Sequence, residues 1–314
     1  MGPWHISSRL ATAALVGLLA LDVLLVATAL RSTSAGAIDT SPLSSESVDP
    51  SLSPTSTGSV APAAKPSPAP GAPSAPLQVM LVALDNRHAW RGGAGSCSAG
   101  GATLATTVDG GKTWATSDAK LSRIVRVRPT GNRAAFIIGA EASCAAQLRN
   151  TSDAGTTWTP AGSVAQAWYR DPRSPRVVRA PGSLTSQPCG KSVVLDLAVL
   201  TSGSARVLCA DGLLRTTTNS GSRWVTAGQV DGAVALAVPA VRQADTYVAR
   251  LGAPGCAGVQ ILRVRPQDVI SCVRASVPRE PGQIAISLID GGGWLAIGNA
   301  TLRSADNLAT WRTS

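Results

Sequence analysis

An aspartate stands among hydroxyl side chains in two nearly identical stretches, TTVDGGKTW at residues 106–114 and NTSDAGTTW at residues 150–158. A carboxylate in such a loop can be catalytic, because it can accept or donate a proton. It can also close a tight turn, since an Asp or Asn side chain accepts hydrogen bonds from backbone amides two residues on. Nothing in the repeated pattern requires a substrate. We therefore expect these aspartates to stabilise turns.

The pattern S/T-x-D-x-G-x-T-W occurs twice in full and twice in part. The third copy has asparagine for aspartate and Arg223 for the second threonine, and the fourth has Leu308 for glycine. The glycine provides a backbone position that is often at positive φ, and the tryptophan begins a strand and packs between sheets. The structural residues are Thr107, Asp109, Gly111, Thr113, Trp114, Thr151, Asp153, Gly155, Thr157, Trp158, Thr217, Asn219, Gly221, Trp224, Ser304, Asp306, Thr310 and Trp311.

These copies resemble the Asp-box, or BNR, repeat of sialidase-like β-propellers. The same repeat is found in the photosystem II stability/assembly-factor family and in sortilin-type receptors. The resemblance covers roughly residues 77–314. It implies an all-β propeller in which each box is a structural hairpin away from the ligand-binding face.

Short apolar strands before the boxes give the number of blades. A fifth such strand, TYVARLG at residues 246–252, is followed by QILRVRPQD, which we interpret as an eroded box. The pattern predicts a propeller of about five four-stranded blades. One interval between successive apolar strands is longer than the others and contains an insertion of about 25 residues. We interpret this insertion as a long loop between Trp168 and Cys189. Six blades are the alternative, if the insertion contains a degenerate unit.

Sialidases are the enzymes to compare. A resemblance to sialidases would imply an arginine cluster that binds a carboxylate and a Tyr–Glu pair that acts as the nucleophile. Tyr247 and Glu280 are the residues available for that pair. The Phe-Arg-Ile-Pro motif of that family is absent, because the sole phenylalanine, Phe136, precedes isoleucine. His88 is the only histidine after the N-terminal apolar run, and no G-x-S-x-G is present. We expect no catalytic residue, metal or cofactor, with a sialidase-like exo-glycoside hydrolase as the alternative.

Arginine is in excess, and the formal net charge is +10. Its planar guanidinium suits carboxylates and phosphates, although a solvated basic surface would have the same composition. One cluster contains Arg123, Arg126, Arg128 and Arg133. The insertion combines arginines with aromatic residues, the types that most often anchor interfaces. Its candidate binding residues are Trp168, Tyr169, Arg170, Arg173, Arg176 and Arg179.

The six cysteines all follow the N-terminal segments, and none forms a C-x-x-C pair. An even number in an exported chain favours disulfides over a metal site. In a repeat protein, neighbours in sequence are usually neighbours in the sheet. The expected pairs are Cys97–Cys144, Cys189–Cys209 and Cys256–Cys272.

The N-terminus contains an apolar run, residues 10–30, interrupted only by Asp22. At ~1.5 Å per residue it spans roughly 31 Å, the thickness of a bilayer core. It predicts a transmembrane signal anchor with residues 1–9 in the cytoplasm. The alternative is a signal peptide cleaved after Ala35–Ala37, AGA. Residues 31–76, rich in Ser, Thr, Pro and Ala, predict a disordered stalk.

Together these features predict a single-pass membrane protein whose propeller, residues 77–314, is extracytoplasmic, or else a secreted protein. We expect a binding or assembly module at the cell surface. The expected partner is an envelope protein or an anionic cell-surface polymer, with membrane contact through the N-terminal helix. Nucleic acid is not an expected partner outside the cell.

Overall fold

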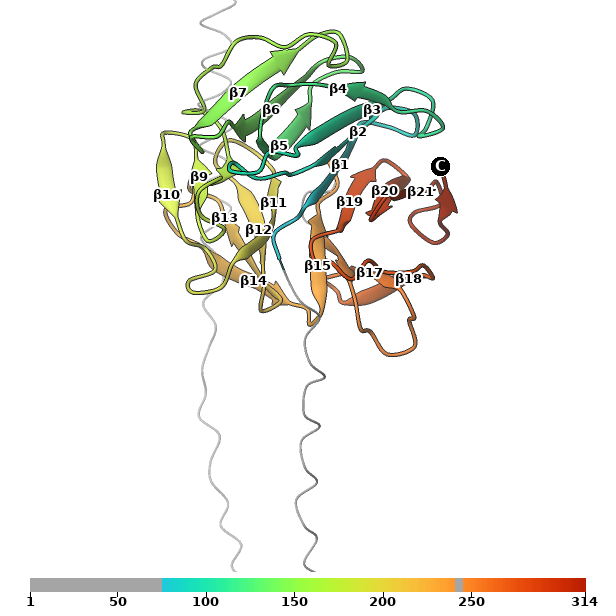
Figure 1. Ribbon diagram of the computed structural model, residues 1–314. Coiled ribbons are helices and arrows are strands. Elements are labelled where there is room, and N and C mark those ends of the chain that lie inside the picture. Colours follow the sequence, from blue (N-terminus) through green and yellow to red (C-terminus); the bar gives the residue numbers. More distant parts are fainter. Residues whose placement is uncertain (1–74, 241–244) are drawn as a thin grey trace, which may run out of the picture. The chain divides into compact units, whose positions relative to one another are not determined.

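The computed structural model describes residues 75–240 and 245–314, which form six antiparallel sheets (Figure 1). Blade 1 consists of β1 (Val79–Ala83), β2 (Ala89–Gly93), β3 (Thr103–Thr107) and β4 (Ala115–Ser117). Blade 2 consists of β5 (Arg123–Pro129), β6 (Ala135–Ala140) and β7 (Ala146–Thr151). Blade 3 consists of β8 (Tyr169–Arg170), β9 (Val178–Ala180) and β10 (Leu184–Ser186).

The second half of the ring has three complete blades. Blade 4 consists of β11 (Val194–Val199), β12 (Ala205–Cys209), β13 (Leu213–Thr217) and β14 (Val225–Gln229). Blade 5 consists of β15 (Ala233–Ala237), β16 (Tyr247–Arg250), β17 (Val259–Arg263) and β18 (Asp268–Val273). Blade 6 consists of β19 (Ile284–Ile289), β20 (Gly292–Ile297), β21 (Ala300–Ser304) and β22 (Arg312–Thr313).

The innermost strands of the six sheets contact one another in a closed ring, in the order β1, β5, β8, β11, β15, β19 and back to β1. The fold is therefore an all-β propeller, as expected, but it has six blades. The prediction of about five was wrong, because the segment interpreted as a long loop folds as blade 3. Its strands are too short, two or three residues each, to show an alternating pattern in the sequence.

Alternating strand direction gives the propeller two distinct faces. The turns after the first and third strands of a blade lie on one face, which we call the turn face; it includes residues 84–88, 108–114 and 305–311. The turns after second strands and the connections between blades lie on the opposite face, and they include residues 94–102 and 274–283. All six cysteines lie on or beside these latter segments. We call this side the disulfide face.

Blades 2 and 3 each have three strands instead of four. Blade 2 lacks its last strand and blade 3 lacks its first, so the two missing strands would follow one another in the sequence. The fourth strand of blade 2 is reduced to a single bridge between Leu148 and Gly162. Blade 3 has no counterpart of the usual inner strand. Trp168, just before β8, bonds to Ser202 O on the turn face, whereas Pro175 O, after β8, accepts from Val194 N on the disulfide face. Hence β8 runs opposite to the other inner strands.

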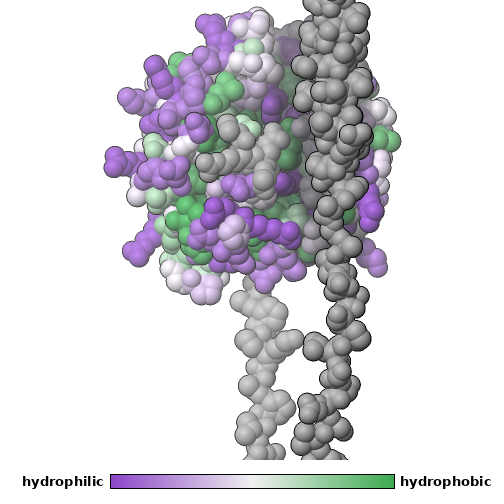
Figure 2. All heavy atoms as spheres, turned by 180° about the vertical axis from the view of Figure 1, so that it is seen from behind, coloured by the Kyte–Doolittle hydropathy of each residue, from purple (hydrophilic) through white to green (hydrophobic). Residues whose placement is uncertain are grey.

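Tryptophans join neighbouring blades, as the repeat pattern predicts. The rings of Trp90 and Trp158 meet edge to face at 6.1 Å between centroids, and those of Trp168 and Trp224 do so at the same distance. Trp114 in blade 1 meets Trp294 in blade 6 at 6.3 Å, which helps close the ring. Apolar side chains fill the spaces between sheets. Figure 2 shows hydrophilic side chains prominent at the rim of one face.

Residues 1–9, the apolar run 10–30 and nearly all of the predicted stalk lie outside the described residues. Within residues 75–240 and 245–314, there is no helix of the length and apolarity needed to cross a membrane.

Candidate binding site

Each repeated turn is closed by its own side chains. The hydroxyl of Thr107 donates to Asp109 Oδ1 (2.8 Å) and accepts from Gly111 N (2.8 Å). The Asp109 carboxylate also accepts from Thr113 N (3.0 Å) and Thr113 Oγ1 (2.6 Å). The amide bonded to the carboxylate is thus four residues on, not two as expected. The same network recurs around Asp153. The turn at Asn219 lacks the second hydroxyl bond, because Arg223 replaces threonine. The turn at Asp306 keeps the bonds from the Ser304 hydroxyl and from Thr310.

These contacts keep the turn aspartates ionised. The hydroxyl of Thr157, followed by the Thr157 amide and the Thr151 hydroxyl, lowers the pKa of Asp153 to about 2. Corresponding groups lower the pKa of Asp306 to about 2, with the Thr310 hydroxyl as the largest contribution. A carboxylate with this pKa is unprotonated at neutral pH and is unsuited to act as a general acid. The geometry agrees with a structural role.

The residues available for a Tyr–Glu nucleophile pair lie on opposite faces. Tyr247 is the first residue of β16, at the turn face, whereas Glu280 lies in the connection 274–283 on the disulfide face. A single substrate group cannot contact both. The sialidase-like arrangement is therefore not assembled from Tyr247 and Glu280.

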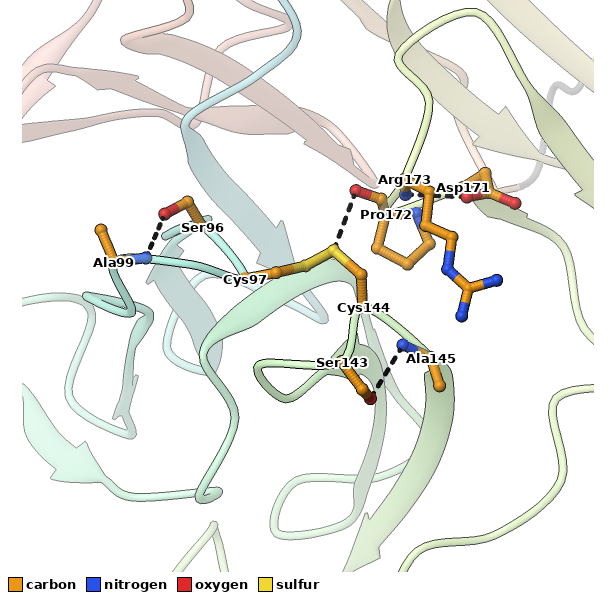
Figure 3. The surroundings of a disulfide bond; sticks show 9 residues. All are labelled: Ser96, Cys97, Ala99, Ser143, Cys144, Ala145, Asp171, Pro172 and Arg173. Atoms are coloured by element: carbon orange, nitrogen blue, oxygen red, sulfur yellow. Dashed lines mark hydrogen bonds between the residues drawn. A yellow bond between two sulfur atoms is a disulfide. The ribbon is translucent and has the colours of Figure 1, made fainter.

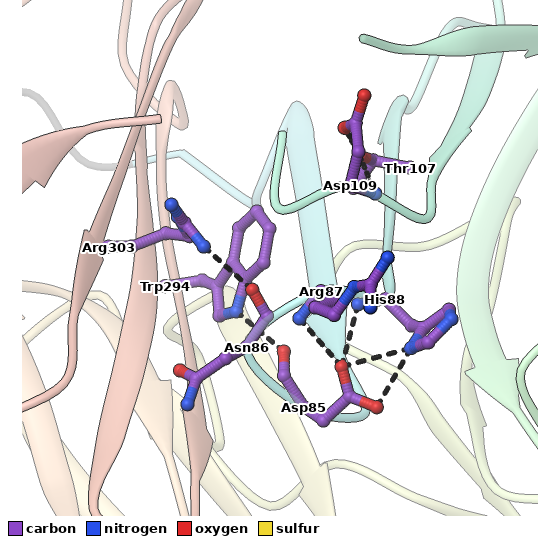
Figure 4. A network of polar contacts seen from close by, with 8 residues as sticks. All are labelled: Asp85, Asn86, Arg87, His88, Thr107, Asp109, Trp294 and Arg303. Carbon is purple, nitrogen blue, oxygen red and sulfur yellow. Dashed lines mark hydrogen bonds and ion pairs between the residues drawn. The ribbon is translucent and has the colours of Figure 1, made fainter. Parts of the chain in front are cut away.

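His88 belongs to a turn at the junction of blades 1 and 6 (Figure 4). Its Nδ1 lies 2.8 Å from Asp85 Oδ2, and Asp85 also accepts from the amides of Arg87 and His88. Burial would raise the pKa of Asp85, but these hydrogen bonds lower it below its ordinary value. Trp294 Nε1 donates to Asp85 O at 2.9 Å. No hydroxyl group in the described residues bonds to His88, so the pair stabilises the turn.

The six candidate binding residues of the insertion occupy different environments. Trp168, Tyr169 and Arg170 are buried, and Trp168 Nε1 donates to Ser202 O at 2.8 Å. Arg179 Nε donates to Asp171 at 2.8 Å. Arg173 and Arg176 are exposed, and neither guanidinium makes a hydrogen bond or ion pair within the described part of the chain. Of the six residues only Arg173 and Arg176 are thus exposed, both in the turn 171–177 between β8 and β9.

The turn 171–177 begins beside the Cys97–Cys144 disulfide, where Figure 3 shows Asp171, Pro172 and Arg173. Asp171 Oδ1 accepts from Arg173 N at 2.8 Å. Pro172 O lies 3.6 Å from Cys144 Sγ, whose disulfide with Cys97 links blades 1 and 2. The bonds Cys189–Cys209 and Cys256–Cys272 are also formed, so all three expected pairs are confirmed. The connections on this face are therefore pre-organised, which lowers the entropy lost on binding.

A cavity of about 370 Å³ lies in the central channel and is lined by all six blades. Its lining is buried near Leu77 and Arg170 and becomes exposed at Arg128 and Ala240, so the cavity opens on the turn face. At the closed end Leu77 N donates to Leu195 O (3.1 Å), and Arg170 Nη1 donates to the same oxygen (3.1 Å). These bonds across the channel form the floor of the cavity.

Half-buried Asp196 and buried Arg170 both line the cavity, and each affects the pKa of the other. Burial raises the pKa of Asp196, while hydrogen bonds from the amides of Leu236 and Leu197 and the charge of Arg170 oppose the rise. Burial lowers the pKa of Arg170, and Asp196 opposes that change. Asp196 was not among the residues singled out from the sequence; a single aspartate in an apolar strand is its only signal. No set of three His, Cys, Asp or Glu residues in the described ranges could hold a metal.

No protein-family model and no curated protein matches this chain. Among solved structures it is similar in fold to YCF48 bound to D1 peptide, with 18% identity, a TM-score of 0.30, and coverage of 76% of this chain and 69% of that one. It is also similar in fold to the SapL1 lectin in complex with alpha methyl fucoside, with 10% identity, a TM-score of 0.43, and coverage of 76% of this chain and 95% of that one. For the GH74 xyloglucanase from Xanthomonas campestris the identity is 15% and the TM-score is 0.31, with coverage of 73% of this chain and 36% of that one. These similarities concern the fold alone.

Proposed function

We propose that this chain is a non-catalytic, extracytoplasmic β-propeller of the Asp-box type that binds an anionic partner at the cell surface. The observation that supports binding most directly is the position of Arg173 and Arg176. Both are exposed and without an acidic partner, on a turn held beside a disulfide. Arginine is favoured where carboxylate or phosphate groups are recognised.

The partner class follows from this charge. An acidic face of an envelope protein or an anionic cell-surface polymer would complement two exposed guanidinium groups on one turn. A sialidase-like hydrolase is the weaker alternative, because Tyr247 and Glu280 lie on opposite faces.

The test is an affinity capture from intact cells with the full-length chain, after mild crosslinking. The variant Arg173→Ser/Arg176→Ser should lose the captured partner without a change in melting temperature. The matched control, Arg133→Ser/Arg223→Ser, removes the same charge from exposed positions on the turn face and should retain the partner. Capture should weaken as salt rises, because exposed charges are screened. If Arg173→Ser/Arg176→Ser captured the same partners as the control variant, the binding site would not lie on the turn 171–177.

A further inference from the structure

A second cavity, of about 240 Å³, lies on the disulfide face at the junction of blades 5 and 6. Its lining comes from the connection 274–283 and from the ends of β15, β16 and β19 on that face. The exposed surface of this lining is mainly apolar. Val234 and Ile284 are buried, whereas the side chain of Val277 is 36% exposed. Such a cavity favours an apolar occupant.

The chain enters the propeller beside this cavity. The carbonyl oxygen of Gly282, a lining residue, accepts hydrogen bonds from Gln78 N (2.8 Å) and Val79 N (3.1 Å). A Cβ added to Gly282 would lie 2.5 Å from Pro76 O, so the two residues are in close contact. Ala75 is the first described residue. The residues just before Ala75 are therefore tethered at the edge of the cavity, at the high effective concentration that a short linker provides.

The sequence of the tethered segment suits an apolar cavity. Residues 66–74, PSPAPGAPS, contain four prolines and no charged residue. A prolyl residue has no N–H group, so its burial leaves no amide donor unpaired. In the polyproline II conformation three residues make one turn, so Pro70, Pro73 and Pro76 would lie on one face. This conformation is preformed in proline-rich chains, and binding in it costs little entropy.

We propose that this cavity is the docking site for residues 70–74 of the same chain, with the rings of Pro70 and Pro73 against its apolar lining. Pro76 already lies at the edge of the cavity, and the two other prolines precede it at intervals of one turn. Docking fixes the end of the predicted stalk to the disulfide face, the face of the turn 171–177. This inference goes beyond the proposed partner binding and does not depend on it.

NMR relaxation of the isotope-labelled full-length chain in lipid nanodiscs tests the proposal at the amide of Ala72. In the docked segment the order parameter of this amide should be that of a rigid backbone, about 0.85. Val277→Asp places a charge in the cavity from an exposed position, so the order parameter should fall below about 0.6 at an unchanged melting temperature. The matched control, Val269→Asp, changes an exposed valine outside the cavity and should leave Ala72 ordered. The same order parameter in the parent and in Val277→Asp, or an equal fall in both variants, would overturn the proposal.

A second measurement observes the cavity itself. Pro70→Ala/Pro73→Ala changes only residues that precede the propeller, and it should shift the methyl NMR signals of Val277 because the two rings no longer contact the lining. Unchanged Val277 signals would overturn the proposal even if Val277→Asp failed to fold. Replacing both arginines of the turn 171–177 by serine should leave Ala72 ordered, which distinguishes loss of docking from loss of the proposed partner.

Discussion

At the scale of single residues, the repeated turns show how few side chains define a blade. Thr107 is buried and bonds both to the Asp109 carboxylate and to the buried amide of Gly111. Gly111 has a φ of +86°, and an added Cβ would lie 2.6 Å from the Ser314 hydroxyl oxygen. In the fourth copy Leu308 adopts a φ of +71° with its side chain buried. Burial of that side chain offsets the backbone strain expected at positive φ.

Replacing Thr107 by alanine should therefore destabilise the propeller by about 1–3 kcal/mol, because the buried amide of Gly111 loses its acceptor. The measurement is urea unfolding of the variant and of the parent chain. Thr107→Ser keeps the oxygen and should cost less. If alanine and serine had the same effect, the hydroxyl would not be the stabilising group.

The turn aspartates also predict a dependence of stability on acid. The pKa of Asp153 in the folded chain, about 2, lies below its ordinary value of 3.8. Its contribution is complete above the ordinary value and is lost as the pH falls toward 2. Asp153→Asn should flatten the fall in melting temperature over this range, since an amide does not titrate. The reciprocal change Asn219→Asp should steepen it; parallel curves for all three chains would refute this account.

At the scale of elements, blade 3 departs from the pattern of its neighbours. It is built from three short strands, and its inner position is occupied by β8, which runs against the other inner strands. Side chains replace some of the missing pairing, as Arg126 does at Trp168 O. On the disulfide face, Cys97–Cys144 joins the turns of two blades, whereas Cys256–Cys272 lies within blade 5.

Removing disulfides should lower stability unequally. In the chain-entropy account a bridge stabilises by about 2–4 kcal/mol, and more when the loop is longer. The separation is 47 residues for Cys97–Cys144 and 16 for Cys256–Cys272. Cys97→Ser/Cys144→Ser should thus lower the free energy of unfolding more than Cys256→Ser/Cys272→Ser, as measured by urea titration. Thiol titration of the denatured parent chain should find no free thiols, and six would contradict the pairing.

At the scale of the whole molecule, closure of the ring joins the two ends of the propeller. Trp114 meets Trp294, and Arg303 Nη1 donates to Asn86 O at 2.7 Å, so blade 6 is bonded directly to blade 1. Such closure leaves no blade with an unpartnered side. The two faces are then free for separate roles, with Arg173 and Arg176 exposed on the disulfide face and the channel mouth on the turn face.

The attachment of this propeller to a membrane is a prediction from residues 10–30. An apolar run of this length favours an uncleaved signal anchor, because secretory signal regions are usually shorter, about 7–15 residues. Intact-mass measurement of the chain from the membrane fraction should therefore find the whole sequence. A mature chain beginning at Ile38 would instead indicate a secreted protein.

The sequence by itself determined the features that depend on neighbours along the chain. A threonine, an aspartate and a glycine within five positions specify a turn here, and each cysteine pairs with its neighbour in the order of the chain. The tertiary structure decided the number of blades and the cavity. The β8 strand is two residues long, and Arg126 meets Trp168 across 42 positions of sequence. The sequence shows an arginine cluster there but not which arginine bonds to the next blade, because that contact forms only when the ring closes.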